Sequence, residues 1–372
     1  APNALVIPGA TGESSARGSA ATPSSRGELF DAGYPWARGR RTEAFDGFSP
    51  DPGPARVVVI MGSPGAGKTS RVAPLTGRGF LRLNRDDRGG KLDDLLAPME
   101  AEAAQGVRHF VLDNTYPTRA SRRGVLEVAG RHGLPVDCVH IDIPEEEALY
   151  NASLRIFRGQ GRMLSPEELS AGVKTDPTLL PPQAIYRFRS VLEPPSADEG
   201  FRALHTEIFR RRVDPDQSRR ALVLDYDGTL RESSGPAPFP RNPDEVRILP
   251  GRKETLARYR EEGWLLLGVS NQSGVARGDL DLATAQACFA RTNELLEQDI
   301  PVLFCPHPAG AVRCWCRKPM PGLGVALIET YGLDRSASLY VGDLETDATF
   351  ARNVGFGFRH ADEFFAIKSP QP

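Results

Sequence analysis

The sequence predicts an α/β protein with two domains, each built around a sheet of parallel strands. From Arg56 to about residue 213, the apolar runs "RVVVI", "FLRLN", "HFVLD" and "VDCVHID" alternate with amphipathic stretches. A polar segment, "VDPDQSRR", separates them from a second series, which begins at "ALVLDYDGTL" and continues with "WLLLGVS", "PVLFC" and "SLYVGD". Such alternation implies parallel strands joined by crossover helices, and 372 residues are enough for two cores.

Composition divides the chain into four parts. We expect an N-terminal extension over residues 1–53, flexible or partly docked, a first domain over 54–213, a linker over 214–220 and a second domain over 221–372. The start of the extension is rich in Ala, Ser, Gly and Pro without an apolar period, which is typical of a flexible tail. Its later part carries aromatic side chains, and we favour packing on the first domain over an arm that docks a partner.

The totals narrow the classes of function. A net charge of -2 gives no global signal for a polyanion, so a nucleic-acid surface would have to be local. The five cysteines do not fit a secreted disulfide framework. The chain holds neither an apolar run long enough to span a membrane nor a signal-peptide pattern at its start. We therefore expect a soluble cytoplasmic protein with no membrane partner.

The stretch "MGSPGAGKTS", which directly follows the first apolar strand, matches a phosphate-binding P-loop. Gly62, Gly65 and Gly67 let backbone N–H groups close around phosphate oxygens. Lys68 would reach the β and γ phosphates of ATP, and the Thr69 hydroxyl would ligate Mg²⁺. An ordinary glycine-rich turn is the alternative, and the preceding strand favours the nucleotide site.

Charged residues follow the next strands of the first domain. Asp86 and Asp87 end the second strand and Asp113 ends the third, at the sheet edge where open α/β folds bind ligands. A carboxylate there can accept the proton of an attacking hydroxyl. Arg155 and Arg158 lie on a predicted helix before a glycine-rich loop, which is the layout of a lid that stabilises transferring phosphoryl charge.

These runs, together with "VLDNTYPTRASR", "NASLRIF" and "IYRFRSVLEPPSADEGF", resemble the kinase domain of polynucleotide kinase/phosphatases over nearly all of residues 55–213. The resemblance implies transfer of the γ-phosphate of ATP to the 5′-hydroxyl of a nucleic acid. It also implies Asp86 as general base, Asp113 and Arg122 on the acceptor side, and Arg155 in the lid.

The second domain opens with "LDYDGTL", in which Asp225 and Asp227 stand two residues apart at a strand end. Alternate residues of an extended segment share a face, so both carboxylates would point into one site. Asp225 can attack phosphorus, while Asp227 protonates the leaving group and later activates water. A pair of capping aspartates in a turn is the alternative.

Later motifs supply partners for this pair in the expected order. "VSNQSG" offers Ser270, "RKP" offers Lys318 to neutralise phosphoryl charge, and "VGDLETD" offers Asp343 and Asp347 to hold Mg²⁺ with Asp225 and Asp227. The set resembles the haloacid dehalogenase superfamily, with Asn271 and Arg317 as substrate-binding residues and a Rossmann-like fold. About forty residues separate Asp227 from Ser270, and a similar number separate Ser270 from Lys318, so neither interval holds a large cap domain.

The loop "CPHPAGAVRCWC" carries a closed set of nitrogen and sulfur donors suited to a structural, tetrahedral Zn²⁺. The predicted ligands are Cys305, His307, Cys314 and Cys316. Cys138 and Cys288 are interpreted as buried cysteines. The loop is similar to that of histidinol-phosphate and heptose-bisphosphate phosphatases, whereas polynucleotide 3′-phosphatases do not usually carry it. We expect zinc removal to unfold the phosphatase locally and to leave kinase activity.

Three functions are compatible with these motifs. The first is a bifunctional end-healing enzyme, which phosphorylates 5′-hydroxyl ends and removes 3′-phosphates from DNA or RNA, with a ligase as a partner acting downstream. The second is a small-molecule kinase fused to a sugar-phosphate or histidinol-phosphate phosphatase. The third is a nucleotide-gated scaffold, which the completeness of both catalytic sets disfavours. The extent of the kinase resemblance favours the first.

Overall fold

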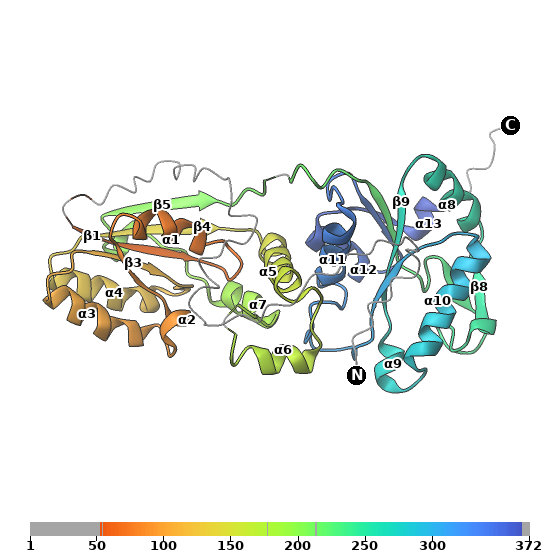
Figure 1. The fold of residues 1–372 in the computed structure, drawn as a ribbon, viewed down its shortest axis with the longest axis horizontal. Helices are drawn as coiled ribbons and strands as arrows, with labels where there is room; N and C mark the ends of the chain where they lie inside the picture. Colours follow the sequence, from red (N-terminus) through yellow and green to blue (C-terminus); the bar gives the residue numbers. More distant parts are fainter. Residues whose placement is uncertain (1–52, 54, 177, 213, 367–372) are drawn as a thin grey trace, which may run out of the picture.

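The computed structural model describes residues 53, 55–176, 178–212 and 214–366, so the expected N-terminal extension lies outside them except for Gly53. Two lobes follow one another along the long axis of the molecule, and each contains a five-stranded parallel sheet flanked by helices (Figure 1). The predicted fold class is therefore confirmed. Among the described residues, no helix is long and apolar enough to cross a membrane.

The first domain has the strand order β2-β3-β1-β4-β5. Its central strand β1 is buried at every position, because helices cover both faces of the sheet. The strands are β1 (Arg56–Gly62), β2 (Leu81–Leu83), β3 (His109–Asp113), β4 (Val136–Asp142) and β5 (Ala203–Ile208). The α-helices are α1 (Thr69–Thr76), α2 (Arg85–Arg88), α3 (Leu96–Ala104), α4 (Arg119–Arg131), α5 (Glu145–Gln160), α6 (Pro166–Gly172) and α7 (Gln183–Val191).

The second domain has the strand order β10-β9-β6-β11-β12, with the antiparallel pair β7-β8 beside it. Its strands are β6 (Ala221–Leu224), β7 (Arg231–Ser233), β8 (Val246–Ile248), β9 (Leu265–Asn271), β10 (Val302–Cys305), β11 (Leu339–Gly342) and β12 (Gly357–His360). Its α-helices are α8 (Arg252–Glu261), α9 (Ser273–Arg277), α10 (Leu282–Leu296), α11 (Gly322–Tyr331), α12 (Glu345–Val354) and α13 (Ala361–Phe364). Between β6 and β9 the chain forms only β7, β8, a short 3₁₀ turn and α8, so this segment holds no cap domain.

Helix α5 joins the two domains, because it lies between the two sheets and packs against α11 and α12 (Figure 1). Leu149 and Ile156 of α5 belong to the same apolar cluster as Val58 of β1 and Ile328 of α11. The two domains therefore share one core, although each has its own sheet. A second cluster, which includes Leu256, belongs to the second domain alone.

We expect Ile156→Ala to lower the free energy of unfolding by about 2–5 kcal/mol, since it leaves a cavity in the shared core. Amide hydrogen exchange in denaturant should show weakened protection in both sheets. The control, Leu256→Ala, should weaken only the second domain. Protection lost only in the first domain of the Ile156→Ala variant would show that the cluster does not couple the domains.

Candidate active sites

The P-loop between β1 and α1 has a backbone that only glycine fits. Gly62, Gly65 and Gly67 have φ angles of 150°, 82° and 83°. A Cβ at Gly62 would lie 2.7 Å from the carbonyl oxygen of Ile141, and one at Gly65 would lie 2.6 Å from that of Ala148. The loop therefore packs closely on the backbone at Ile141 and Ala148, which leaves room only for glycine at Gly62 and Gly65. Such glycines let backbone N–H groups surround a phosphate.

Lys68 lies inside this loop, where its ammonium donates to the carbonyl oxygens of Gly62 (3.0 Å) and Ser63 (2.9 Å). Burial lowers the pKa of Lys68 to about 8, and the nearby charges of Asp113 and Asp86 oppose the shift. The buried Ser63 hydroxyl has no hydrogen-bond partner among the described residues. The glycine cradle, the inward lysine and this hydroxyl fit a bound triphosphate, and Thr69 follows as the exposed first residue of α1.

Asp86 is held at the start of α2 by an amide side chain. The Asn84 Oδ1 atom accepts hydrogen bonds from the main-chain N–H groups of Asp86 (2.7 Å) and Asp87 (3.3 Å). The Nδ2 atom of Asn84 donates to the Asp113 carboxylate at 2.8 Å. The Asp86 carboxylate is half exposed and pairs with Arg85 at 2.9 Å. The structure thus brings Asp86 and Asp113 together beside Lys68, with Asp86 open to an incoming hydroxyl.

Arg82 is a residue of this site that we did not single out from the sequence. Its guanidinium makes two hydrogen bonds of 3.0 Å to the buried Asp113 carboxylate and pairs with Asp87 at 2.6 Å. Residues two apart along a strand point to the same face, so Arg82 and Asn84 at the end of β2 share one face. This alternation was the signal that could have identified Arg82.

Arg155, on α5, is exposed and close enough to Lys68 to contribute to its electrostatic environment. The expectation for Arg122 needs correction, because its side chain is fully buried. Arg122 pairs with Glu199 through two bonds of 2.7 Å and donates to the carbonyl oxygens of Tyr116 and Glu193. Its donors are directed into the domain, so it supports the fold and does not reach an acceptor.

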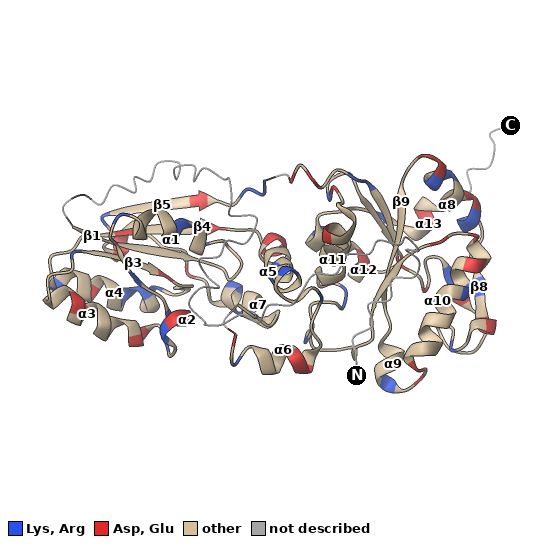
Figure 2. Cartoon of the chain, viewed as in Figure 1, with Lys and Arg blue, Asp and Glu red and all other residues tan. Residues whose placement is uncertain are grey.

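Two further arginines of the first domain are paired with acidic side chains. Arg119 pairs with Asp198 at 2.9 Å, and Arg158, expected in the lid, pairs with Glu329 of the second domain at 2.6 Å. Figure 2 shows basic and acidic residues interspersed along both lobes. This mixture of charges agrees with the net charge of -2 of the whole chain.

In the second domain, carboxylate oxygens of Asp225, Asp343 and Asp347 lie within 4.8 Å of one another. Lys318 faces this cluster, with Nζ 2.7 Å from an oxygen of Asp225 and 2.7 Å from one of Asp347. Burial would lower the pKa of Lys318, but the charges of Asp225 and Asp347 raise it. Burial raises the pKa of Asp225 to about 7, and Lys318 opposes this shift. Oxygen ligands of this kind fit Mg²⁺, which would favour the ionised carboxylates.

The Asp227 side chain is not part of this cluster, contrary to its expected role as a metal ligand. One carboxylate oxygen accepts from Arg231 Nε at 2.8 Å, and the other accepts from Gln272 Nε2 at 2.7 Å. Gln272 also bonds the Ser270 hydroxyl at 3.0 Å. Arg231 and Gln272 thus fix the orientation of the Asp227 carboxylate, and neither residue was singled out from the sequence.

Asn271 and Arg317, both expected to bind substrate, make contacts within the protein. The Asn271 amide accepts from the main-chain N–H of Lys318 at 3.0 Å and donates to its carbonyl oxygen at 3.2 Å. Arg317 donates to the carbonyl oxygen of His307 at 3.4 Å. These bonds position Lys318 and attach its segment to the cysteine-rich loop.

A cavity of about 290 Å³ opens beside these catalytic side chains. Its wall combines polar groups near Asp227 and Asp343 with the apolar side chains of Phe239 and Leu344. The other lining residues are Gly228, Pro238, Asn271, Gln272, Ser273 and Gly274.

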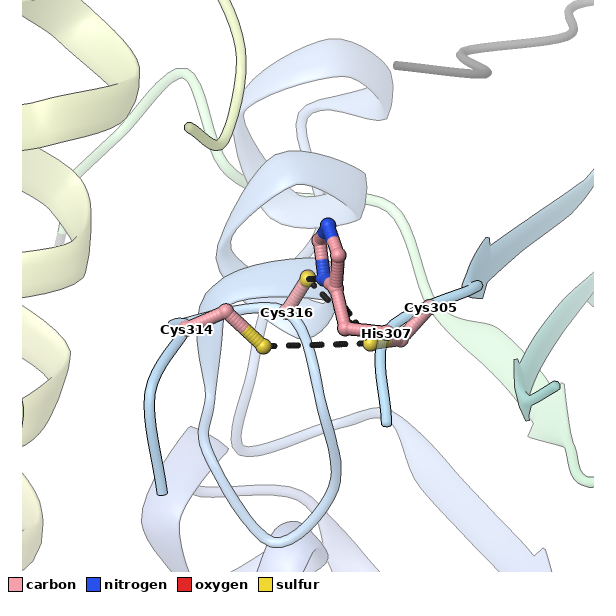
Figure 3. Close-up of side chains that lie close together, drawn as sticks. All are labelled: Cys305, His307, Cys314 and Cys316. Atoms are coloured by element: carbon pink, nitrogen blue, oxygen red, sulfur yellow. Dashed lines mark hydrogen bonds between the residues drawn. The ribbon is translucent and has the colours of Figure 1, made fainter. Parts of the chain in front are cut away.

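The four predicted zinc ligands meet at one point (Figure 3). The Nδ1 atom of His307 lies 3.3 Å from Cys305 Sγ and 3.1 Å from Cys316 Sγ, and Cys305 Sγ lies 3.8 Å from Cys314 Sγ. Three thiols and one imidazole at these separations fit the tetrahedral donor set of a structural Zn²⁺. The remaining cysteines are buried elsewhere.

Trp315, between two of these cysteines, docks the loop on the first domain. Its side chain is fully buried, and Nε1 donates to the carbonyl oxygen of Leu180 at 2.8 Å. The Gln183 side chain of α7 donates to the carbonyl oxygen of Val312 from the other side. The zinc loop is therefore also part of the interface between the domains. We accordingly expect loss of zinc to affect both domains, and not the phosphatase domain alone.

Comparison with known proteins agrees with two catalytic domains. Residues 57–169 match the family model described as an AAA domain, and residues 220–365 match the model described as polynucleotide kinase 3 phosphatase. The chain is 38% identical over 141 residues to a D-glycero-beta-D-manno-heptose-1,7-bisphosphate 7-phosphatase of Pseudomonas aeruginosa, covering 37% of this chain and 78% of that protein. It is 34% identical over 146 residues to a probable D-glycero-D-manno-heptose-1,7-bisphosphate 7-phosphatase of Thermoplasma volcanium. This match covers 38% of this chain and 97% of that protein.

Among solved structures, a chain of the Pnkp1/Rnl/Hen1 RNA repair complex aligns with 82% of this chain and 95% of its own length. The identity is 16% and the TM-score is 0.28, values that establish neither a common substrate nor a common assembly.

The fold and the two sites define an enzyme in which a P-loop kinase domain is joined to a haloacid dehalogenase phosphatase domain. The resemblance seen in the motifs is thus confirmed. Through its second domain, the chain belongs to the haloacid dehalogenase family that includes these heptose-bisphosphate phosphatases.

We expect the purified chain to carry a single zinc ion, which Cys316→Ser should release. Because structural zinc contributes folding energy, the zinc-free chain with Mg²⁺ restored should exchange amide hydrogens faster in residues 305–316 and also in 179–191, where Trp315 docks. Elemental analysis and exchange mass spectrometry test this expectation. Faster exchange confined to residues 305–316 would show that docking does not depend on the metal.

Trp315→Ala should reproduce the faster exchange in residues 179–191 with zinc still bound, since it removes the docking side chain and retains the ligands. The matched control is Trp264→Ala, because Trp264 packs on Tyr259 within the second domain. Equal exchange in both variants would contradict the docking role of Trp315.

Proposed function

We propose that this enzyme heals nucleic-acid ends, by ATP-dependent phosphorylation of 5′-hydroxyls and by hydrolysis of 3′-phosphates. The observation that carries the proposal is the match of residues 220–365 to a polynucleotide kinase 3 phosphatase model in a chain that also contains a P-loop kinase domain. The two activities belong together chemically, because a ligase needs a 5′-phosphate beside a 3′-hydroxyl. The proposed partners are DNA or RNA ends and a downstream ligase, and the proposed location is the cytoplasm.

In the kinase reaction, the P-loop and Lys68 would hold the phosphates of ATP, and Thr69 would ligate Mg²⁺, which supplies charge neutralisation. Asp86 would accept the proton of the 5′-hydroxyl as its oxygen attacks the γ-phosphorus. Arg82 and Asn84 hold the Asp113 carboxylate in place, and Asn84 also caps the start of α2. Arg155 would approach the transferring phosphoryl group from α5.

In the phosphatase reaction, the Asp225 carboxylate would attack phosphorus and form an aspartyl phosphate, while Asp227 donates a proton to the leaving 3′-oxygen. Asp227 would then accept a proton from the water that hydrolyses the intermediate. Lys318 and the Ser270 hydroxyl would bind the phosphoryl oxygens. Asp225, Asp343 and Asp347 would hold Mg²⁺, which would supply a Lewis acid, and Asp347 also contacts Lys318.

A second candidate function is supported by the curated relatives and by the zinc loop. The heptose-bisphosphate phosphatases named above match the second domain along most of their own length. In this alternative, the phosphatase acts on a sugar phosphate or histidinol phosphate and the kinase acts on a metabolite.

The two-site assignment predicts separable losses. Asp86→Asn should slow 5′ phosphorylation by about 10²–10⁴-fold and spare the phosphatase, whereas Asp225→Asn should abolish phosphatase activity and spare the kinase. Asp93→Asn is the matched control for the kinase site, because it changes an exposed carboxylate of the short 3₁₀ helix that follows α2 and should leave both activities unchanged. Loss of both activities in either single mutant would contradict two independent sites.

The substrate class is tested with a synthetic oligonucleotide that carries a 5′-hydroxyl and a 3′-phosphate, prepared as DNA and as RNA. Incubation with Mg²⁺, with and without ATP, is followed by intact mass. We expect a gain of phosphate at the 5′ end only with ATP, and loss of the 3′-phosphate in both cases. A 3′-phosphate that survives would redirect the phosphatase to sugar or histidinol phosphates, and two unchanged ends would favour the small-molecule alternative.

A further inference from the structure

Helix α5 contacts the P-loop through its first two turns. The Nδ2 atom of Asn151 donates to the carbonyl oxygen of Gly65 at 2.8 Å. The approach of the two segments is close, since a Cβ at Gly65 would lie 2.6 Å from the carbonyl oxygen of Ala148. The conformation of the P-loop at Gly65 therefore depends on where α5 lies and on how the Asn151 amide is oriented.

The Asn151 amide is oriented by charged groups on its other side. Arg211, which follows β5, donates to the Asn151 Oδ1 atom at 2.5 Å and to the Glu147 carboxylate at 2.6 Å. An amide with its oxygen bonded to a guanidinium must present its NH₂ group elsewhere, and here that group faces Gly65. Arg211 thus selects the amide orientation that bonds the P-loop.

The same Glu147 carboxylate binds Arg335 of the second domain, through bonds of 3.0 and 3.3 Å to its two oxygens. The guanidinium groups of Arg335 and Arg211 also lie 4.4 and 4.3 Å from the ring centroid of Tyr150. The three charged side chains are only 15–24% exposed, so their interactions are weakly screened. Gly355 makes room for this arrangement, because a Cβ there would lie 2.2 Å from the Arg335 guanidinium.

We propose that Arg335, a residue of the phosphatase domain, is a positioning residue of the kinase site. Through Glu147 and Arg211 it keeps the Asn151 amide bonded to Gly65 and so fixes the P-loop. Without Arg335, Glu147 is left with a single partner, and the Glu147–Arg211 pair can turn away from Asn151. This inference rests on the proposed ATP binding at the P-loop, but it does not depend on the identity of the phosphate acceptor.

Arg335→Ala in the full chain tests the inference. We expect the Kd for ATP·Mg²⁺, measured by calorimetry, and the KM for ATP to rise by up to about tenfold, as for loss of the one hydrogen bond from Asn151 to Gly65. Phosphatase kcat should be unchanged, because Arg335 is not among the residues of that site. Arg335→Lys keeps the positive charge and should raise the Kd for ATP less than Arg335→Ala does. The matched control is Arg359→Ala, because Arg359 is an exposed arginine on β12.

A double-mutant cycle separates positioning from general support of the fold. Asn151→Leu removes the bond to Gly65 and leaves Arg335 in place, so it should weaken ATP binding to a similar extent. The combined variant should bind ATP no more weakly than either single variant, because both changes act on one bond. Additive losses, or an unchanged Kd in Arg335→Ala, would overturn the inference. A wild-type chain that binds no ATP would overturn the kinase assignment together with it.

Discussion

The packing of helix α5 between the two domains is the constraint on which the rest of the structure depends. Leu149 and Ile156 are buried in the shared core, Asn151 bonds the P-loop, and Arg155 of the same helix lies near Lys68. Because protein interiors are closely packed, α5 cannot shift against one domain without losing contacts with the other. The order of the kinase site is thus linked to the fold of the phosphatase domain.

Both sites hold their charged groups with amide side chains. In the kinase domain, Asn84 orders the start of α2. In the phosphatase domain, Asn271 clamps the main chain of Lys318, and Gln272 donates to Asp227. An amide supplies a donor and an acceptor from one rigid group, so it can satisfy backbone and charge together. Buried charges that lack such partners would be strongly destabilising.

Most of the fold could be predicted because the buried strands are continuous apolar runs. Within the two parallel sheets, the strands that were not predicted are β5 and β12, which are edge strands without a fully buried residue, so their apolar pattern is weak. The short antiparallel strands β7 and β8 were not predicted either. Most of the predicted aspartates were found because they lie at or just beyond strand ends. Gln272 was missed although it stands two residues from Ser270, and Arg122 was misassigned because its partner Glu199 is 77 residues away.

By itself, the sequence determined two α/β domains, a P-loop, an aspartate-based phosphatase site and a zinc-type loop, since each is marked by short runs of neighbouring residues that can be read along the chain. Only the tertiary structure decided how these parts act on one another. Trp315 meets Leu180, and Arg335 meets Glu147, across more than a hundred residues. No local pattern specifies such pairs, because the contact exists only after both domains have packed on α5.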